Sequence, residues 1–275
     1  MADSVALTAG VRANLLSLQR TSDLIGTTQQ RLSSGLKVNS ALDDASAFFT
    51  SVALDNRAAD LGELKSDIDL AISTIESAIN GIDAITELVQ QAKGLANQAK
   101  ATGDTSEKST LAVQFNALLD QIDDVANDSS FNGTNLIQAT PDNLTVEFNE
   151  DGTSDLTITG LDATTASTGI NITEAANNFG ADSNIDTALT ELNSALTELR
   201  TNASTLGSNN TVLQTRLNFT DDLINTLETG AGKLTLADLN EESANLLALQ
   251  TREQLGINSL SLAAQSERSI LALFG

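Results

Sequence analysis

The sequence lacks several residue types on which binding and catalytic chemistry depend. Its 275 residues include no Cys, His, Trp or Tyr, and Pro141 is the only proline. The chain therefore cannot build a metal site from thiolates or imidazoles, nor use histidine as an acid–base catalyst. Without cysteine it has no disulfide, which fits either a cytosolic protein or a surface protein stabilised by packing and assembly. These absences predict a protein without enzymatic activity, metal or cofactor.

Basic residues are also scarce. The chain has 14 Lys and Arg against 37 Asp and Glu, which gives a net charge of -23. This balance repels phosphate backbones and anionic membrane surfaces. The start of the chain has neither the basic nor the apolar region of a secretory signal, and no apolar run approaches the ~18 residues of a membrane span. We therefore expect no nucleic-acid or membrane partner, and no cleaved signal peptide.

The polar groupings that resemble catalytic motifs have simpler explanations. Adjacent carboxylates such as Asp221–Asp222 point in different directions on a helix, so capping and solvation account for them better than catalysis. Gly232–Lys233 resembles a phosphate-binding loop, but Leu227 and Leu234 stand where that motif needs glycine and a hydroxyl. An enzyme that uses acidic residues alone is the weakest interpretation of this sequence.

Heptad patterns cover most of the chain and predict a mainly α fold. Apolar residues recur every seven positions from Val11 to Leu32, although Asn14, Thr21 and Thr28 interrupt the seam, so this helix is amphipathic but incomplete. Longer patterns predict helices over residues 43–99, 104–128 and 182–230. The predicted buried seam of the resulting rod consists of Leu61, Ile68, Ile75, Ile82, Val89, Leu192, Leu199, Leu206 and Leu213.

Capping patterns predict where these helices begin and end. Ser40 with Asp43, Ser183 with Asp186, and Thr235 with Asp238 each match a capping box before an apolar run. Gly35, Gly103 and Gly230 occupy positions typical of C-terminal caps.

Between the long helices, alternating residues around the turn-rich NEDGTSD predict a β-hairpin over 144–161, followed by a loop or irregular strand over 162–184. The expected fold is thus a long antiparallel helical hairpin, or coiled-coil rod, with a small β-hairpin region.

Three segments resemble one known family. The run RLSSGLKVNSALDD at 31–44 resembles the N-terminal hallmark of bacterial flagellins. The segment LNEESANLLALQTREQLGINSLSLAAQSERSILALFG at 239–275 resembles their C-terminal helix, and FNGTNLI at 131–137 resembles the turn after their third helix. The small size is similar to that of minimal alphaproteobacterial flagellins, which lack large outer domains.

The resemblance implies a division of labour along the chain. Residues 1–42 and 238–275 would be the two arms of the filament core, while 43–181 and 182–237 would form the rod, with the hairpin region at its outer end. Leu42 departs from the family pattern, because many relatives have Lys there. The residues that the resemblance assigns to assembly through the terminal helices are Val11, Leu18, Ile25, Leu32, Leu246, Leu249, Leu260, Ile270 and Phe274.

The resemblance also implies partners and a location. The chain would polymerise with itself, with other flagellins as alternative partners, into an extracellular filament for motility. It would contact hook-associated junction and cap proteins, and an export chaperone would bind its C-terminal helix. Export would follow the flagellar type III route.

Two further expectations concern the outer surface. Thr153, Ser154, Thr164, Thr165, Ser167 and Thr168 are candidate O-glycosylation sites in the outward-facing segment. Strong agonists of the flagellin-sensing toll-like receptor carry a motif resembling L-Q-R-V-R-E-L-A, and residues 89–96 match its position. Here Gln91 replaces the receptor-contacting Arg, Gly94 replaces the Glu, and Leu95 is kept, so we expect weak recognition.

Two other classes of protein fit parts of the pattern. A hook–filament junction protein resembles flagellin at both ends and is the principal alternative. A cytosolic coiled-coil scaffold would explain the missing signal and cysteines, but not the interrupted seams at both termini.

Overall fold

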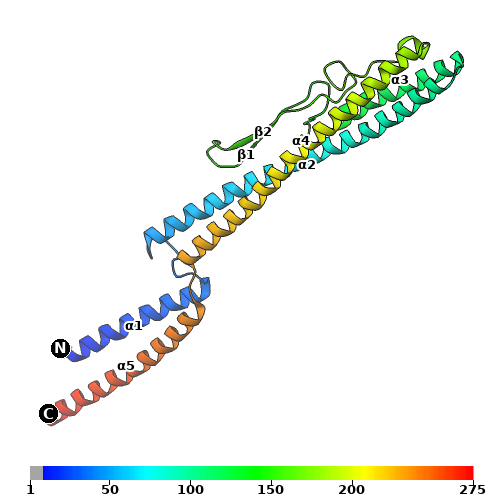
Figure 1. Cartoon of the computed structure of the whole chain (residues 1–275). Helices are drawn as coiled ribbons and strands as arrows, with labels where there is room; N and C mark the ends of the chain where they lie inside the picture. Colours follow the sequence, from blue (N-terminus) through cyan, green and yellow to red (C-terminus); the bar gives the residue numbers. More distant parts are fainter. Residues whose placement is uncertain (1–8, 275) are drawn as a thin grey trace. The chain divides into compact units, whose positions relative to one another are not determined.

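The computed structural model describes residues 9–274, without the side chains of 267 and 270–274, and it is mainly helical (Figure 1). Five α-helices, one short 3-10 helix and one β-hairpin make up its regular elements in the described range. In chain order the elements are α1 Ala9–Ser34, α2 Ala45–Ala101, α3 Thr105–Asp128, β1 Leu144–Glu147, β2 Asp155–Ile158, the short 3-10 helix η1 Ala176–Phe179, α4 Asp182–Thr235 and α5 Leu239–Phe274. The predicted fold class, long helices with one small hairpin, is confirmed.

Glycines at the predicted helix ends behave differently from one another. Gly35 has a φ of +73° and donates its N–H to the Arg31 carbonyl at 2.8 Å, so it caps α1 as predicted. Gly103 follows the end of α2 without a positive φ. The cap predicted at Gly230 is wrong, because α4 continues through it to Thr235. A helical glycine costs only about 1 kcal/mol relative to alanine, which tertiary packing can offset.

Aspartates supply the observed N-terminal caps, and two predicted capping boxes are wrong. Ser183 lies inside α4, and Asp238 caps α5 itself by accepting the Asn240 N–H at 2.9 Å. Asp43 does bond back to the Ser40 N–H at 2.9 Å, but it closes a turn just before α2. The [ST]-x-x-[DE] pattern places each cap near the right residue, yet it cannot say which polar side chain reaches the free N–H groups.

The chain forms two compact units. We call residues 1–57 and 226–275 the terminal unit, and residues 58–225 the middle unit. The terminal unit contains the α1–α5 pair, and the middle unit contains α3 and the hairpin. The domain boundaries expected from the resemblance divide the chain differently and stay a prediction.

The middle unit has a continuous apolar core. All nine side chains predicted for the rod seam are at most 2 % exposed. Phe115 of α3 and Phe179 of η1 pack edge to face, with ring centroids 5.2 Å apart. The segment expected to be a loop or irregular strand contains no strand, but it buries Ile170 and Ile172 against this core. This segment therefore covers one side of the core, although its polar composition gives no indication of this role.

A buried polar side chain, that of Asn135, caps the C-terminal end of α3. The Asn135 side chain is buried, and its amide donates to the carbonyls of Ala126 and Asn127, both at 2.9 Å. Its own carbonyl accepts the Ile137 N–H at 2.9 Å. Asn132 and Gly133 just before it have φ of 50° and 83°, as a tight two-residue turn requires. The family-like segment at 131–137 is therefore a turn followed by a helix cap.

The β-hairpin is short and antiparallel. Its register pairs Leu144 with Ile158 and Glu147 with Asp155, and the side chains of Val146 and Ile158 are buried. Arg216 of α4 stacks over the Phe148 ring beside it, 4.9 Å from the centroid. A two-stranded sheet is marginal alone, so these contacts with the helices hold the hairpin in place.

The close approach of α2 to the end of α3 generates a prediction. A Cβ on Gly81 would lie 2.2 Å from the Ser129 hydroxyl and 2.7 Å from Ile137 Cδ1, whereas one on Gly62 would meet nothing within 4 Å. We expect Gly81→Ala to destabilise the middle unit by about 1–3 kcal/mol through overpacking. Gly62→Ala, the control in the same helix, should stabilise by up to ~1 kcal/mol. Urea unfolding of the monomer measures both, and equal effects would contradict the close packing.

Candidate interaction surface

The terminal helices α1 and α5 pack side by side along an imperfect seam (Figure 1). In α1 the seam contains Val11, Leu18, Ile25 and Leu32, of which only Val11 is fully buried. In α5 the partly covered residues include Leu246, Leu249 and Leu260, which keep the same 4-3 spacing as Glu253 and Gly256. These are seven of the nine residues predicted for assembly. The other two, Ile270 and Phe274, lie in α5, but their side chains are outside the described residues.

Two of the three polar interruptions of the α1 seam, Thr21 and Thr28, are its most buried positions, whereas Asn14 is exposed. Thr21 and Thr28 are 4 % and 6 % exposed, less than the leucines around them. The Thr21 hydroxyl donates to the Ser17 carbonyl at 3.0 Å, so its polar group needs no partner across the interface. On the facing helix, a Cβ on Gly256 would lie 3.2 Å from Leu18 Cδ1. Small side chains thus bring the helices close together, where larger apolar residues would hold them apart.

An ion pair fixes the register of the two helices. Arg31 near the end of α1 donates to Glu242 in the first turn of α5 at 3.0 Å. The Glu242 side chain is only 11 % exposed, whereas that of Arg31 is 38 % exposed, so Glu242 is the shielded partner of the pair. Such a charge left without its partner would be costly, which opposes sliding of one helix along the other.

The connection between α1 and α2 and the connection between α4 and α5 are hydrogen-bonded to each other. Lys37 N–H donates to the Thr235 carbonyl at 2.7 Å, and Ala237 N–H donates to the Gly35 carbonyl at 2.9 Å. The Lys37 ammonium also donates to the Lys233 carbonyl at 2.8 Å. The connections between α1 and α2 and between α4 and α5 therefore form one short antiparallel bridge.

Large apolar side chains are exposed mainly on the terminal unit. Sixteen large apolar residues among those described are exposed, and twelve of them belong to this unit. We call these twelve the terminal apolar surface: Leu15, Leu16, Leu24, Leu42, Phe49, Val52, Leu236, Leu239, Leu247, Leu255, Ile257 and Leu262. None of them was singled out for assembly from the sequence. The sequence feature that could have indicated this surface is the presence of large apolar residues at positions outside the heptad seam.

The net negative charge, unlike the exposed apolar side chains, is concentrated on the middle unit. Residues 1–57 and 226–275 carry 8 basic against 11 acidic side chains, a net charge of -3. Residues 58–225 carry 6 basic against 26 acidic side chains, a net charge of -20. Nearly all of the repulsion between copies of this chain therefore arises from the middle unit.

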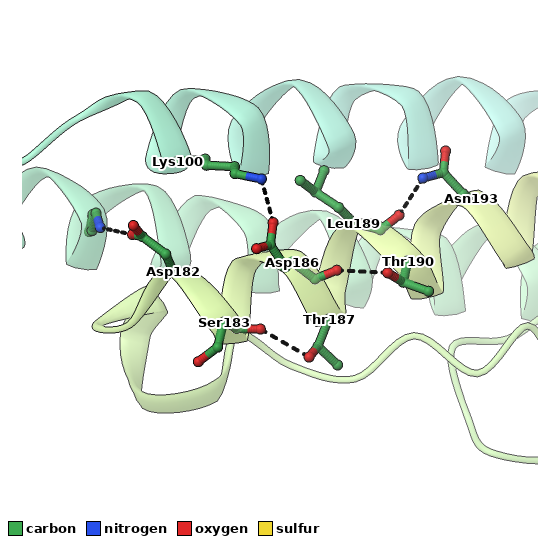
Figure 2. Close-up of polar contacts among 9 residues, drawn as sticks. Lys100, Asp182, Ser183, Asp186, Thr187, Leu189, Thr190 and Asn193 are labelled. Atoms are coloured by element: carbon green, nitrogen blue, oxygen red, sulfur yellow. Dashed lines mark hydrogen bonds and ion pairs between the residues drawn. The ribbon is translucent and has the colours of Figure 1, made fainter.

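The few lysines of the middle unit bind α4. Lys100 of α2 contacts Asp186, Lys108 of α3 contacts Asp182 at 2.6 Å, and Lys65 of α2 contacts Asp221 (Figure 2 shows the first two aspartates). The hydrogen bond and charge of Lys108 lower the pKa of the Asp182 carboxyl, and the bond to Asp186 raises the pKa of Lys100. These pairs set the position of α4 along α2 and α3.

Hydroxyl and amide side chains on the outer face of α4 bond to their own helix. Thr187, Thr190 and Asn193 donate to the carbonyls four residues earlier, as Figure 2 shows. These side chains therefore satisfy part of their hydrogen-bonding capacity within α4 itself.

The structure places the six glycosylation candidates in different surroundings. Thr164 is 3 % exposed and its hydroxyl donates to Asp162 at 2.6 Å, so the folded chain does not present it to an enzyme. Thr165 is half-buried and bonds to Asp123. Thr153, Ser167 and Thr168 are exposed, and Ser154 is half-buried.

The three residues of the expected receptor patch also differ. Gln91 and Gly94 are exposed, and a Cβ on Gly94 would meet no atom within 4 Å. Leu95 packs against the core of the middle unit.

The described residues contain no group of three or more side chains suited to hold a metal ion. Within residues 9–274, no helix combines the length and the apolar character needed to span a membrane.

Comparisons with known proteins agree across the whole chain. The family model of the bacterial flagellin N-terminal helical region matches residues 9–142, and that of the C-terminal helical region matches residues 185–274. The chain is 34% identical to flagellin FljK of Caulobacter vibrioides, over 99% of this chain and 98% of that protein. It is 30% identical to a flagellin of Brucella melitensis, over 100% and 98%. A crystal structure of Bacillus cereus flagellin covers 56% of this chain and 88% of its own, with a TM-score of 0.49 and 20% identity.

The ion pair between Lys108 and Asp182 predicts a dependence on pH. Because the pKa of Asp182 is lowered in the folded state, the pair stabilises the middle unit above the ordinary carboxyl pKa of about 4, and this is lost as pH falls through the lowered value. We expect Lys108→Met to lower the melting temperature modestly at pH 7, with a difference that vanishes toward pH 2. Lys93→Met is the control, since Lys93 bonds to the neutral Asn193 amide at 2.7 Å. Identical pH profiles of the two variants would exclude the ion pair as the cause.

Proposed function

The chain belongs to the bacterial flagellin family, the structural subunits of the flagellar filament, and from this membership we propose that it polymerises through the terminal apolar surface. Nothing among the relatives named above favours the hook–filament junction alternative. The observation that carries the proposal is the concentration of exposed apolar side chains on the unit that is nearly neutral.

Burial of this surface supplies the driving force for assembly. Complete burial of one leucine side chain stabilises an interface by about 1.5–3 kcal/mol. The twelve residues are partly exposed, and association costs about 4–15 kcal/mol of translational and rotational freedom. Several of them must therefore be covered at once, which a subunit surrounded by neighbours achieves and a single pair does not.

The charge distribution supports an inner position for the terminal unit. A net charge of -20 on the middle unit makes close packing there unfavourable, whereas -3 on the terminal unit does not. Salt screens exposed charges over about 8–10 Å, so middle units in contact with solvent repel one another less than buried ones would. We infer that the terminal helices form the filament core and that the middle unit with its hairpin faces outward.

Location and partners follow from the same surface. Flagellins of this family assemble with themselves into the extracellular filament, and we propose export of this chain by the flagellar type III route without a cleaved signal. We propose that an export chaperone covers the exposed leucines of α5 before assembly, and that junction and cap proteins bind the same terminal unit at the filament ends. We assign no catalytic activity and no cofactor. Recovery of the chain from cytosol rather than from sheared filaments would favour a coiled-coil scaffold.

A matched pair of substitutions tests the proposed surface. Leu255 in α5 and Val113 in α3 are both 64 % exposed. We expect Leu255→Ser to raise the critical concentration for polymerisation about tenfold, because part of a leucine burial is lost. Val113→Ser should change it less than twofold. Light scattering on seeded monomer measures both, with circular dichroism as the check on folding. Equal behaviour of the two variants would place the interface elsewhere.

We propose that sugars, where present, are attached to Thr153, Ser154, Ser167 and Thr168. Thr153, Ser167 and Thr168 are exposed and Ser154 is half-buried, whereas Thr164 is buried and the Thr165 hydroxyl donates to Asp123. An unmodified mass for peptides of this segment from native filaments would exclude the modification.

We further propose that the flagellin-sensing toll-like receptor responds weakly to this chain. Gln91 and Gly94 cannot supply the paired charges that the resembling motif offers, and loss of such an interfacial charge costs about 2–5 kcal/mol, more than tenfold in affinity. The open space at Gly94 admits a larger side chain.

We expect Gln91→Arg combined with Gly94→Glu to increase the response of receptor-expressing reporter cells to depolymerised protein at least tenfold. Gly94→Ala is the control, because it changes the helix without adding charge. A response of the unmodified chain equal to that of a strong agonist would reject the proposal.

A further inference from the structure

The most exposed large apolar side chain in the described part of the molecule is Leu42, at 97 %. It lies in the turn between α1 and α2, beyond the helices that form the terminal pair. Single exposed leucines are common on mobile segments and need no explanation. Leu42 differs because the turn that carries it is held on both sides.

The hydrogen bonds of this turn are numerous for its length. The Asp43 carboxylate accepts the N–H groups of Asn39 at 3.0 Å and Ser40 at 2.9 Å, and these bonds lower the pKa of Asp43. Leu42 N–H donates to the Ser40 hydroxyl at 3.3 Å. Asp44 then caps α2 by accepting the Ala47 N–H at 3.0 Å.

The base of the turn is fixed as well. Val38 is buried, and its N–H donates to the Thr235 carbonyl at 3.3 Å. The side chain of Leu42 is therefore presented to solvent on a braced turn, with the carboxylates of Asp43 and Asp44 next to it in sequence. A rigid apolar group loses little conformational entropy on binding, as is typical of residues that anchor an interface.

A complementary surface exists on α1. Leu16, Arg20 and Leu24 follow one another at intervals of four residues, so they lie on one face of the helix. All three are exposed, with Leu16 at 49 % and Leu24 at 50 %. This face offers apolar contact on both sides of a positive charge, and Leu42 is an apolar side chain followed in sequence by the carboxylates of Asp43 and Asp44.

We propose that Leu42 of one subunit docks on the Leu16–Arg20–Leu24 face of a neighbouring copy in the filament. The inference rests on the proposed function, since it requires that the chain polymerises. A helical polymer needs contacts between two different surfaces of the subunit, and a contact of this kind repeats without closing. The turn and the α1 face are two such surfaces, and both belong to the nearly neutral terminal unit.

The absence of cysteine makes a direct test feasible. Leu42→Cys chains, isotopically labelled Leu24→Cys chains and unmodified chains are mixed in equal amounts, polymerised and treated with a short thiol-to-thiol crosslinker. Each variant has one thiol, so a mixed dimer can form only between subunits. We expect mixed Leu42–Leu24 dimers from filaments and none from monomers. The control mixture of Leu42→Cys with Val113→Cys should give none.

A second measurement does not depend on thiol geometry. We expect Leu42→Gln to raise the critical concentration about tenfold and Leu42→Met to change it less than twofold, with the monomer's helicity unchanged in both because the side chain is exposed. Filaments that show no mixed dimers, or a critical concentration unaffected by Leu42→Gln, would overturn the docking contact while leaving assembly through α1 and α5 intact. Failure of the unmodified chain to polymerise would instead reject the proposed function.

Discussion

The pairing of α1 with α5 determines how the rest of the terminal unit behaves. Because its seam contains threonines, a glycine and a glutamate, the two helices approach closely but cover little apolar surface. Each helix of the pair buries one apolar stripe against the other, and no further layer of the described chain covers the leucines on the outer faces. The apolar residues on the outer faces of the two helices therefore stay exposed in the single subunit.

The middle unit buries its apolar surface without a second copy of the chain. Three helices and the segment from 131 to 179 enclose its core, so its seam residues are shielded from water without a partner. Its outer surface is acidic, with hydroxyls that bond to their own helix and lysines that bond to neighbouring helices. The apolar core of the middle unit is thus closed, whereas the terminal unit leaves large apolar side chains exposed. This contrast explains how one chain can remain a monomer at low concentration and still form a polymer.

Much of the fold could be predicted from the sequence because heptad spacing is a strong signal over long helices. The helices α2 and α3 begin and end within two residues of their predicted limits, and the hairpin lies where alternation placed it. The failures have physical causes. Gly230 continues a helix because packing outweighs its low helix propensity, and Ser183 lies inside α4, which begins one residue earlier at Asp182.

Features that depend on tertiary contact could not be found in this way. The burial of Ile170 and Ile172 comes from a segment whose composition resembles a solvated loop. Thr21 looks like an interruption in the sequence, yet it is among the best-covered residues of α1, because close helix approach favours small side chains. The exposed leucines of the terminal surface fall outside the heptad pattern. Periodicity identifies residues that face a partner helix and leaves out apolar residues that stay on the surface of the subunit.

The Arg31–Glu242 pair also has a consequence for the order of events during synthesis. Its two residues are 211 positions apart, and the bridge between Lys37 and Lys233 spans 196. Closure of such long loops is slow, and it cannot begin before the distant residue has left the ribosome. The terminal unit is therefore the last part of the chain to fold, although its N-terminal segment is synthesised first. A nascent or truncated chain that lacks α5 cannot form the α1–α5 pair. Such incomplete chains are therefore poorly suited to enter a growing polymer.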